Sequence, residues 1–175
     1  KDGLTHVIHL REGIKFHDGS EINAKAVAHN LRAAFYTSYP LRGPGIYLMI
    51  PLFWGGFPGI VRNIQVLGRR TLKLTLTEPR ADIRGSLCFL PIFNPRVLSV
   101  KTYGSDVEAM KAAGSGPFRL AAFQAGQFAE YTRMPGFFEE AYLDRLRVQL
   151  VPDASARFLA LRSGQAHVAI GLSNP

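Results

Sequence analysis

The sequence is poor in cysteine and in acidic residues. Its 175 residues include one cysteine, which excludes a disulfide framework and a zinc site built on cysteines. Lysine and arginine number 21 against 13 aspartates and glutamates, and no acidic residue lies between Glu21 and Glu78. A positive field of this kind attracts anions, nucleic acid or acidic lipid. Apart from Arg69 and Arg70, however, the basic residues are dispersed singly, which favours solvated surface charges.

Long unbroken hydrophobic runs are also lacking. Residues 44–61 carry no charge over 18 positions, but three prolines and four glycines interrupt them. Those residues would break the hydrogen bonds of a spanning helix, so we expect a loop-rich apolar segment that lines a core or a cleft. Its aromatic residues make it a candidate ligand wall. The opening residues, Lys1–Leu4, resemble the interior of a fold more than a signal peptide.

The polar and apolar residues alternate in several segments that we expect to be strands. Leu72, Leu74 and Leu76 alternate with polar residues over 71–77, and a turn at 68–70 joins this segment to 62–67 in a predicted hairpin. Further strands are expected at 5–10, 118–122, 127–132, 146–151 and 166–170.

Capping residues mark the predicted helices. Asn23 is a favourable N-cap, and the helix that follows should end near Ser38 because Pro40 disfavours helical geometry in the residue before it. Two further helices are expected, one from the capping-box residues Ser105–Glu108 to Gly114 and one from the N-cap Asp153 to Ser163.

Motifs for catalysis, metal binding and nucleotide binding are lacking. His6 and His9 would lie on opposite faces of a strand, and the glycines before Pro117 do not form a phosphate-binding loop. Cys88 lies in the apolar run 83–93, where we expect a buried, unreactive thiol. The basic residues do not follow one helix or an RNA-binding strand pattern, which argues against nucleic acid. We therefore expect no enzyme, no cofactor and no metal site.

Three segments together resemble one protein family. Leu10–Val27 contains LREGIKFHDGS and INAKAV, which are similar to the signature LRxGVKFHDGxxFTAxDV. Gly114–Phe118, GSGPF, is similar to GTGPY, and Leu143–Gln165 is similar to LDKV…IPDxxxR…LxxGEvD. These signatures are those of extracellular solute-binding proteins family 5, the oligopeptide-, dipeptide- and nickel-chelate-binding subunits of ABC importers. The order and spacing agree, so the resemblance spans nearly the whole chain.

The resemblance implies an α/β fold and an internal portion of a longer receptor. The fold expected is part of a two-lobed, periplasmic-binding-protein-like (type II) architecture, with a mixed sheet and flanking helices. Residues 1–113 would be mostly the subdomain Ib-like portion of the first lobe, and 114–175 part of the main first-lobe sheet and helices. The second lobe would be absent. Met134–Tyr142 and Gly164–His167 depart from the family's usual sequences, which leaves the subfamily open.

The candidate ligand-binding residues come from their chemistry and not from the family signature. After the first helix, aromatic rings could stack on a solute and an arginine could pair with a carboxylate. The alternative for each is core packing or a solvated surface. The candidates are Tyr39, Arg42, Tyr47 and Trp54, with Phe93 and Asn94 as weaker ones.

The resemblance implies a receptor that captures peptides or metal chelates in an interlobe cleft and delivers them to a membrane permease. Such a receptor would be periplasmic, or lipid-anchored at the outer face of the cytoplasmic membrane, and monomeric at full length. An alternative is a cytoplasmic solute-sensing domain of a transcriptional regulator with the same fold. An enzyme is a more distant alternative.

Overall fold

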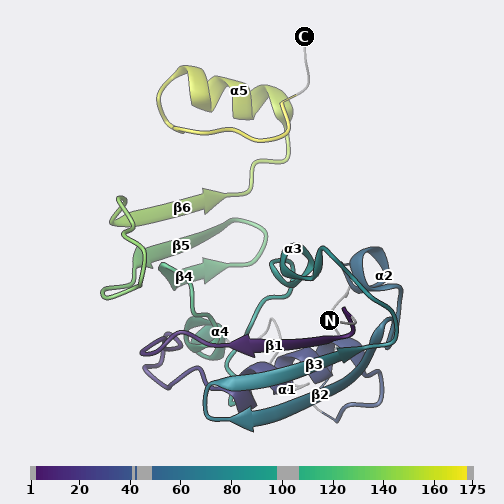
Figure 1. Cartoon of the computed structure of the whole chain (residues 1–175). Helices are drawn as coiled ribbons and strands as arrows, with labels where there is room; N and C mark the ends of the chain where they lie inside the picture. Colours follow the sequence, from purple (N-terminus) through teal and green to yellow (C-terminus); the bar gives the residue numbers. More distant parts are fainter. Residues whose placement is uncertain (1–2, 41, 43–48, 98–106, 173–175) are drawn as a thin grey trace.

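The structure is a computed structural model that describes residues 3–40, 42, 49–97 and 107–172. It contains two three-stranded sheets with short helices around them (Figure 1). The α/β class is confirmed. The sequence led us to expect a mixed sheet, but the strand pairs within the described residues are all antiparallel. Tight turns join β2 to β3 and β4 to β5, and such short connections cannot link parallel neighbours.

The first sheet has the strand order β1-β3-β2, with β1 Thr5–His9, β2 Val61–Gly68 and β3 Thr71–Leu76. The predicted hairpin between the last two strands is confirmed. The leucines of β3 are buried while the residues between them are partly exposed, as the alternating pattern predicts.

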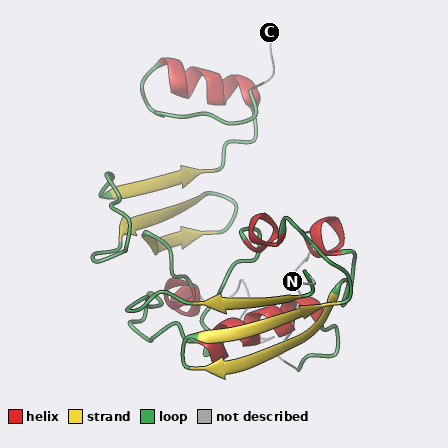
Figure 2. Cartoon of the chain, in the orientation of Figure 1, coloured by secondary structure: helices red, strands yellow, loops and turns green. Residues whose placement is uncertain are grey.

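Helix α1, Ala24–Phe35, covers the buried face of this sheet (Figure 2). Asn23 caps it as predicted, because its side-chain oxygen accepts a hydrogen bond from the backbone N–H of Ala26 at 3.0 Å. The helix ends at Phe35, earlier than the predicted Ser38. The Arg42 guanidinium donates to the carbonyls of Ala33 and Ala34, which satisfies acceptors that another helical turn would use.

The main hydrophobic core lies between α1 and the first sheet. Helix α2, Met49–Trp54, closes one end of it, and the fully buried indole of Trp54 packs edge-on against Phe35 with ring centroids 4.8 Å apart. Other buried members of this core are Phe16, Leu31, Ile64, Leu72 and Leu74.

The segment around Cys88 differs from its prediction. Helix α3, Ile83–Leu87, buries Ile83 and Ser86 at helical spacing, which turns the following Cys88 outward and leaves its thiol exposed. Our prediction of a buried thiol is therefore wrong. Helix α4, Val107–Ala113, ends just before Gly114 as predicted, whereas the capping residues Ser105 and Asp106 lie outside the described residues.

The second sheet has the order β4-β5-β6, with β4 Phe118–Gln124, β5 Phe128–Arg133 and β6 Arg145–Gln149. Helix α5, Ala154–Arg162, follows, and Asp153 caps it as predicted by accepting from the N–H of Ala156 at 2.7 Å.

The predicted strand at 166–170 is wrong. The N–H of Ala166 donates to Ala160 of α5, and Arg157 donates to the carbonyl of Gly171, so this segment returns along the helix and pairs with no strand. Among the described residues, no helix has the length and hydropathy needed to cross a membrane.

Candidate functional site

The described ligand candidates lie at three places around α1. Arg42 and Trp54 lie at its C-terminal end, where both serve the fold: Arg42 caps the helix, with its guanidinium carbon 4.6 Å from the Phe57 ring centroid, and Trp54 is buried against Phe35. Tyr47 lies outside the described residues. These positions give Arg42 and Trp54 structural contacts that the sequence pattern does not reveal.

Tyr39 is half-buried and contacts the middle of α1. Its hydroxyl lies 3.1 Å from Nδ1 of His29, and the two rings pack edge to face at 5.3 Å. His29 is buried, and its Nε2 has no hydrogen-bond partner among the residues that the structure describes. Burial, helped by the charge of Arg32, lowers the pKa of His29, so the imidazole is neutral at neutral pH.

Phe93 is fixed to the middle of α1 by two hydrogen bonds, and Asn94 follows it in the chain. The Asn30 amide donates to the Phe93 carbonyl at 2.8 Å, and its oxygen accepts from the Phe93 N–H at 2.9 Å. The neighbouring Asn94 is almost completely buried, with 1% of its surface exposed.

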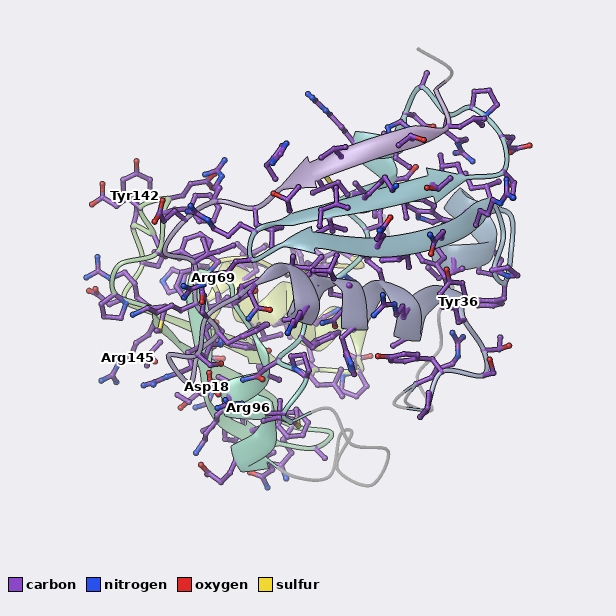
Figure 3. The ribbon with its side chains drawn as sticks, turned by 60° about the horizontal axis from the view of Figure 1, so that its bottom comes forward. Asp18, Tyr36, Arg69, Arg96, Tyr142 and Arg145 are labelled. Carbon is purple, nitrogen blue, oxygen red and sulfur yellow. The ribbon has the colours of Figure 1, made fainter. Side chains whose placement is uncertain are left out.

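The Asn94 side chain joins two loops through a polar cluster. Its amide donates to Asp18 at 2.7 Å and to the hydroxyl of Ser20 at 3.2 Å, and its oxygen accepts from the N–H of Arg96. Figure 3 shows Asp18 beside Arg96. Partial burial acts to raise the pKa of Asp18, but the hydrogen bonds from Ser20 and Asn94 and the charge of Arg96 outweigh it and lower that pKa.

A cavity of about 490 Å³ lies between the start of α1 and this polar cluster. Its lining includes His29 and Asn94, with Lys25 and Arg96 contributing positive charge and Glu21 negative charge. Glu21 is paired with Arg69 at 2.6 Å.

His17 ties this region to the start of the second sheet. Its backbone N–H donates to the Gly114 carbonyl at 2.8 Å, and its Nε2 lies 2.9 Å from the Gly116 carbonyl oxygen. A Cβ atom at Gly114 would lie only 2.8 Å from the His17 ring, so the close approach requires glycine there.

The sequence did not identify the three polar residues that hydrogen-bond to the ligand candidates. They are His29, which contacts Tyr39, Asn30, which bonds to Phe93, and Ser20, which bonds to Asn94. The turn at Asp18–Ser20 was recognisable from Asp-Gly, but the partner of the aspartate is 76 positions away in Asn94. No local pattern reports a contact of that range. Among the described residues, no group of histidine, cysteine and acidic side chains is arranged to hold a metal ion.

A comparison with family models identifies the family of the chain. The model described as bacterial extracellular solute-binding proteins, family 5 Middle, matches residues 1–175. The chain belongs to this family. The resemblance stated from the three sequence segments is thereby confirmed.

Curated family 5 relatives bind several different solutes. The chain is 28% identical over 172 residues to the glutathione-binding protein GsiB of Salmonella typhi, covering 96% of this chain and 31% of the relative. It is 27% identical over 177 residues to heme-binding protein A of Haemophilus influenzae, covering 93% of this chain and 32% of that relative. The chain thus spans about a third of the length of these relatives.

Solved family 5 structures confirm the fold. The periplasmic binding protein DppA of Helicobacter pylori, in complex with the peptide STSA, matches with a TM-score of 0.78 and 26% identity, over 94% of this chain and 34% of that chain. NikZ of Campylobacter jejuni, in complex with Ni(L-His), matches with a TM-score of 0.74 and 21% identity, over 94% and 31% of the two chains. The chain has part of the two-lobed periplasmic-binding-protein fold.

Proposed function

We propose that this chain is part of a solute-binding receptor of an ABC importer, which captures a small solute without chemical change and delivers it to a membrane permease. The observation that carries the proposal is the family match over all 175 residues. We place the receptor in the periplasm or, with a lipid anchor, at the outer face of the cytoplasmic membrane, and expect it to act as a monomer.

Within the peptide and metal-chelate range, we propose a short peptide as the solute. Two relatives at 26% identity or more support this choice, the glutathione-binding GsiB and DppA with its bound STSA. Heme-binding protein A, at 27%, and NikZ with Ni(L-His) keep iron and nickel chelates within the range to be tested.

The proposed mechanism is closure of two lobes around the solute, which shifts an open–closed equilibrium toward the closed state. We assign residues 1–113 to the subdomain Ib-like portion of the first lobe and 114–175 to part of its main sheet and helices. The buried residues of the described chain lie before position 114 with the exception of Leu120, which supports a boundary near this point. The second lobe would come from elsewhere in the receptor.

Tyr39 is the described candidate that we propose for solute contact. Its ring is half-buried and its hydroxyl meets a neutral histidine, so the ring is held in place while part of it remains accessible. Asn94 lines the cavity together with His29, the partner of Tyr39, and the role that we propose for Phe93 and Asn94 is to hold this region in place. Tyr47 remains a prediction, and Arg42 and Trp54 would act by shaping this region.

Calorimetry of the full-length receptor tests the proposal. We expect heat of binding with di- to tetrapeptides, including glutathione, and none with neutral sugars. Tyr39→Ala should weaken peptide binding more than Tyr39→Phe, because only the first removes the ring. Binding of nickel-histidine or heme in place of peptides would change the solute class, whereas binding of sugars alone would overturn the assignment.

Cell fractionation separates the importer from the regulator alternative. The importer predicts release of the full-length protein by osmotic shock. Exclusively cytoplasmic protein, together with an upstream helix-turn-helix, would favour a transcriptional sensor. None of the relatives named above supports that alternative.

A further inference from the structure

His29 and Tyr39 form a hydrogen-bonded pair whose geometry is fixed by the fold. The Tyr39 hydroxyl lies 3.1 Å from Nδ1 of His29, and the two rings meet edge to face with their centroids 5.3 Å apart. The Tyr39 backbone is held as well, because its N–H donates to the Tyr36 carbonyl and its carbonyl accepts from the N–H of Arg42, each at 3.0 Å. The hydroxyl is therefore held in a defined place.

One proton lies in the bond between the two side chains, and its position decides what Tyr39 offers to a solute. A neutral imidazole has one N–H and one bare nitrogen. If the Tyr39 hydroxyl donates to Nδ1, its oxygen can only accept a further hydrogen bond. If Nδ1 donates to the oxygen instead, the hydroxyl proton is available to a solute. The tautomer of His29 thus sets the polarity of Tyr39.

The chemistry of the two groups favours donation by the tyrosine. A phenol is a stronger donor than a neutral imidazole N–H, and an imidazole nitrogen is a stronger acceptor than a phenol oxygen. The arrangement O–H···N is therefore the more stable one. His29 is 9% exposed, and its Nε2 has no partner among the described residues in either tautomer, so the burial of Nε2 does not choose between them.

The surroundings of His29 are mostly cationic. Burial is the main cause of the lowered pKa of His29, and the positive charge of Arg32 adds to it. Both acidic groups nearby are already bonded, Asp18 to Asn94 and Glu21 to Arg69. The charged and titratable groups of the elements around His29 are Lys25, Arg32, Asp18, Glu21, Arg96, Tyr36, Tyr39 and Arg42.

These charges define the kind of donor that suits Tyr39. The positive charge of Arg32 acts on His29, and Arg42 is bonded through its backbone to the Tyr39 carbonyl. An ammonium group at this place would meet charges of its own sign. A backbone N–H of a peptide is a donor without a charge, and it matches an oxygen that can only accept.

We infer that Tyr39 accepts a hydrogen bond from a backbone N–H of the bound peptide, and that His29 is the positioning residue that makes Tyr39 an acceptor by taking its hydroxyl proton. This inference rests on the proposed function in one respect, that the solute is a peptide and contacts Tyr39. It adds a specificity to that contact, because an oxygen atom in place of the N–H would face the Tyr39 oxygen without a proton between them.

Ester analogues of a peptide test the inference on the full-length receptor. The probes are tetra-alanine and the analogues in which one backbone N–H at a time is replaced by an ester oxygen, with affinities measured by calorimetry. We expect one of the esters to bind about tenfold more weakly than the parent peptide. Tyr39→Phe should reduce this ester penalty to about twofold or less, because the facing oxygen is gone. His29→Phe should also reduce it, because the hydroxyl can then turn and donate to the ester.

The dependence on pH separates positioning from packing. Protonated His29 carries an N–H on both nitrogens, so Nδ1 donates to the Tyr39 oxygen and the hydroxyl proton turns toward the solute. The ester penalty should therefore shrink as the pH falls through the pKa of His29, which lies below the usual histidine value. His29→Phe keeps a ring beside Tyr39 but should show no such change. A penalty of equal size in the receptor and in His29→Phe at every pH would overturn the role of His29.

NMR of the receptor with isotope-labelled histidine nitrogens measures the tautomer without any substitution in the protein observed. The signals of His29 are those missing from His29→Phe, or from His29→Gln if the first variant does not fold. At neutral pH we expect the proton on Nε2 and a bare Nδ1. A proton on Nδ1 would overturn the inference, because Tyr39 would then be the donor to the solute.

Failure of this inference differs from failure of the proposed function. A receptor that binds tetra-alanine, but in which Tyr39→Phe leaves every ester penalty unchanged, keeps the proposed solute and contradicts the contact inferred here. A receptor that binds none of the peptides contradicts the proposed solute and, with it, the peptide N–H as the partner of Tyr39.

Discussion

The substitution Asn94→Ala tests the polar cluster that joins two distant loops. Asn94 is 1% exposed and makes three side-chain hydrogen bonds: to the Asp18 carboxylate at 2.7 Å, to the Ser20 hydroxyl at 3.2 Å and from the Arg96 N–H at 3.0 Å. Alanine removes all three and leaves the backbone N–H of Arg96 without this acceptor.

The magnitude follows from these three bonds. A neutral hydrogen bond contributes about 1 kcal/mol to stability and one to a charged group about 1.5–3 kcal/mol. In the variant, Asp18 keeps its bonds from Ser20 and has access to water. The lost bond from Asn94 to Asp18 therefore contributes at the low end of the range for charged groups. The expected loss in the free energy of unfolding is therefore about 2–4 kcal/mol.

Urea unfolding, followed by the fluorescence of Trp54, measures this loss. Residues 1–175 contain one tryptophan, which is buried in the core beside α1, so in this polypeptide its signal reports the unfolding of that core. Asn63→Ala is the matched control, because Asn63 is exposed on β2 and should lose less than about 0.5 kcal/mol. If the two variants unfold at the same urea concentration, the cluster contributes nothing and the reasoning is wrong.

Three further predictions follow from the same region. The lowered pKa of Asp18 in the folded state means that its stabilising contribution is complete above its unfolded pKa and is lost as the pH falls through the folded value. Asp18→Asn should therefore flatten the acid side of a plot of unfolding free energy against pH, and an unchanged profile would contradict this. Gly114→Ala should cost about 1–3 kcal/mol in urea unfolding, because its Cβ would crowd His17, whereas Gly116→Ala, whose Cβ meets nothing within 4 Å, should be nearly neutral. Cys88 should react with a thiol reagent in the absence of denaturant, and a thiol that reacts only in urea would show that it is covered.

Local chemistry in the sequence predicted much of the fold. The N-caps Asn23 and Asp153 hold their helices as expected, because capping needs only a side chain and an N–H three residues on. The errors have non-local causes. The first helix ends early because Arg42 folds back on it, and the segment 166–170 fails to form a strand because Arg157 and α5 hold it.

The ligand candidates were harder to predict because the same residue types suit a core and a binding site. Trp54 is an aromatic residue in a segment predicted to be rich in loops. Such a residue can either stack on a solute or pack in the core, and the sequence does not distinguish the two. Its position against Phe35 depends on α1, whose last turn lies 19 positions earlier in the sequence. Asn94 was a weaker candidate, yet its three hydrogen bonds make it central to the described cluster.

The contacts of the signature residues explain why the family could be recognised while the solute could not. In Leu10–Val27, Phe16 is in the core, Asp18 holds Asn94, and Asn23 caps α1. His17 binds the start of the second sheet. Each of these side chains uses its polar atoms or its surface on another part of the chain, so the pattern is constrained by folding. Solute-contacting residues are free of that constraint and can change with the solute, which is consistent with relatives of similar identity that bind glutathione and heme.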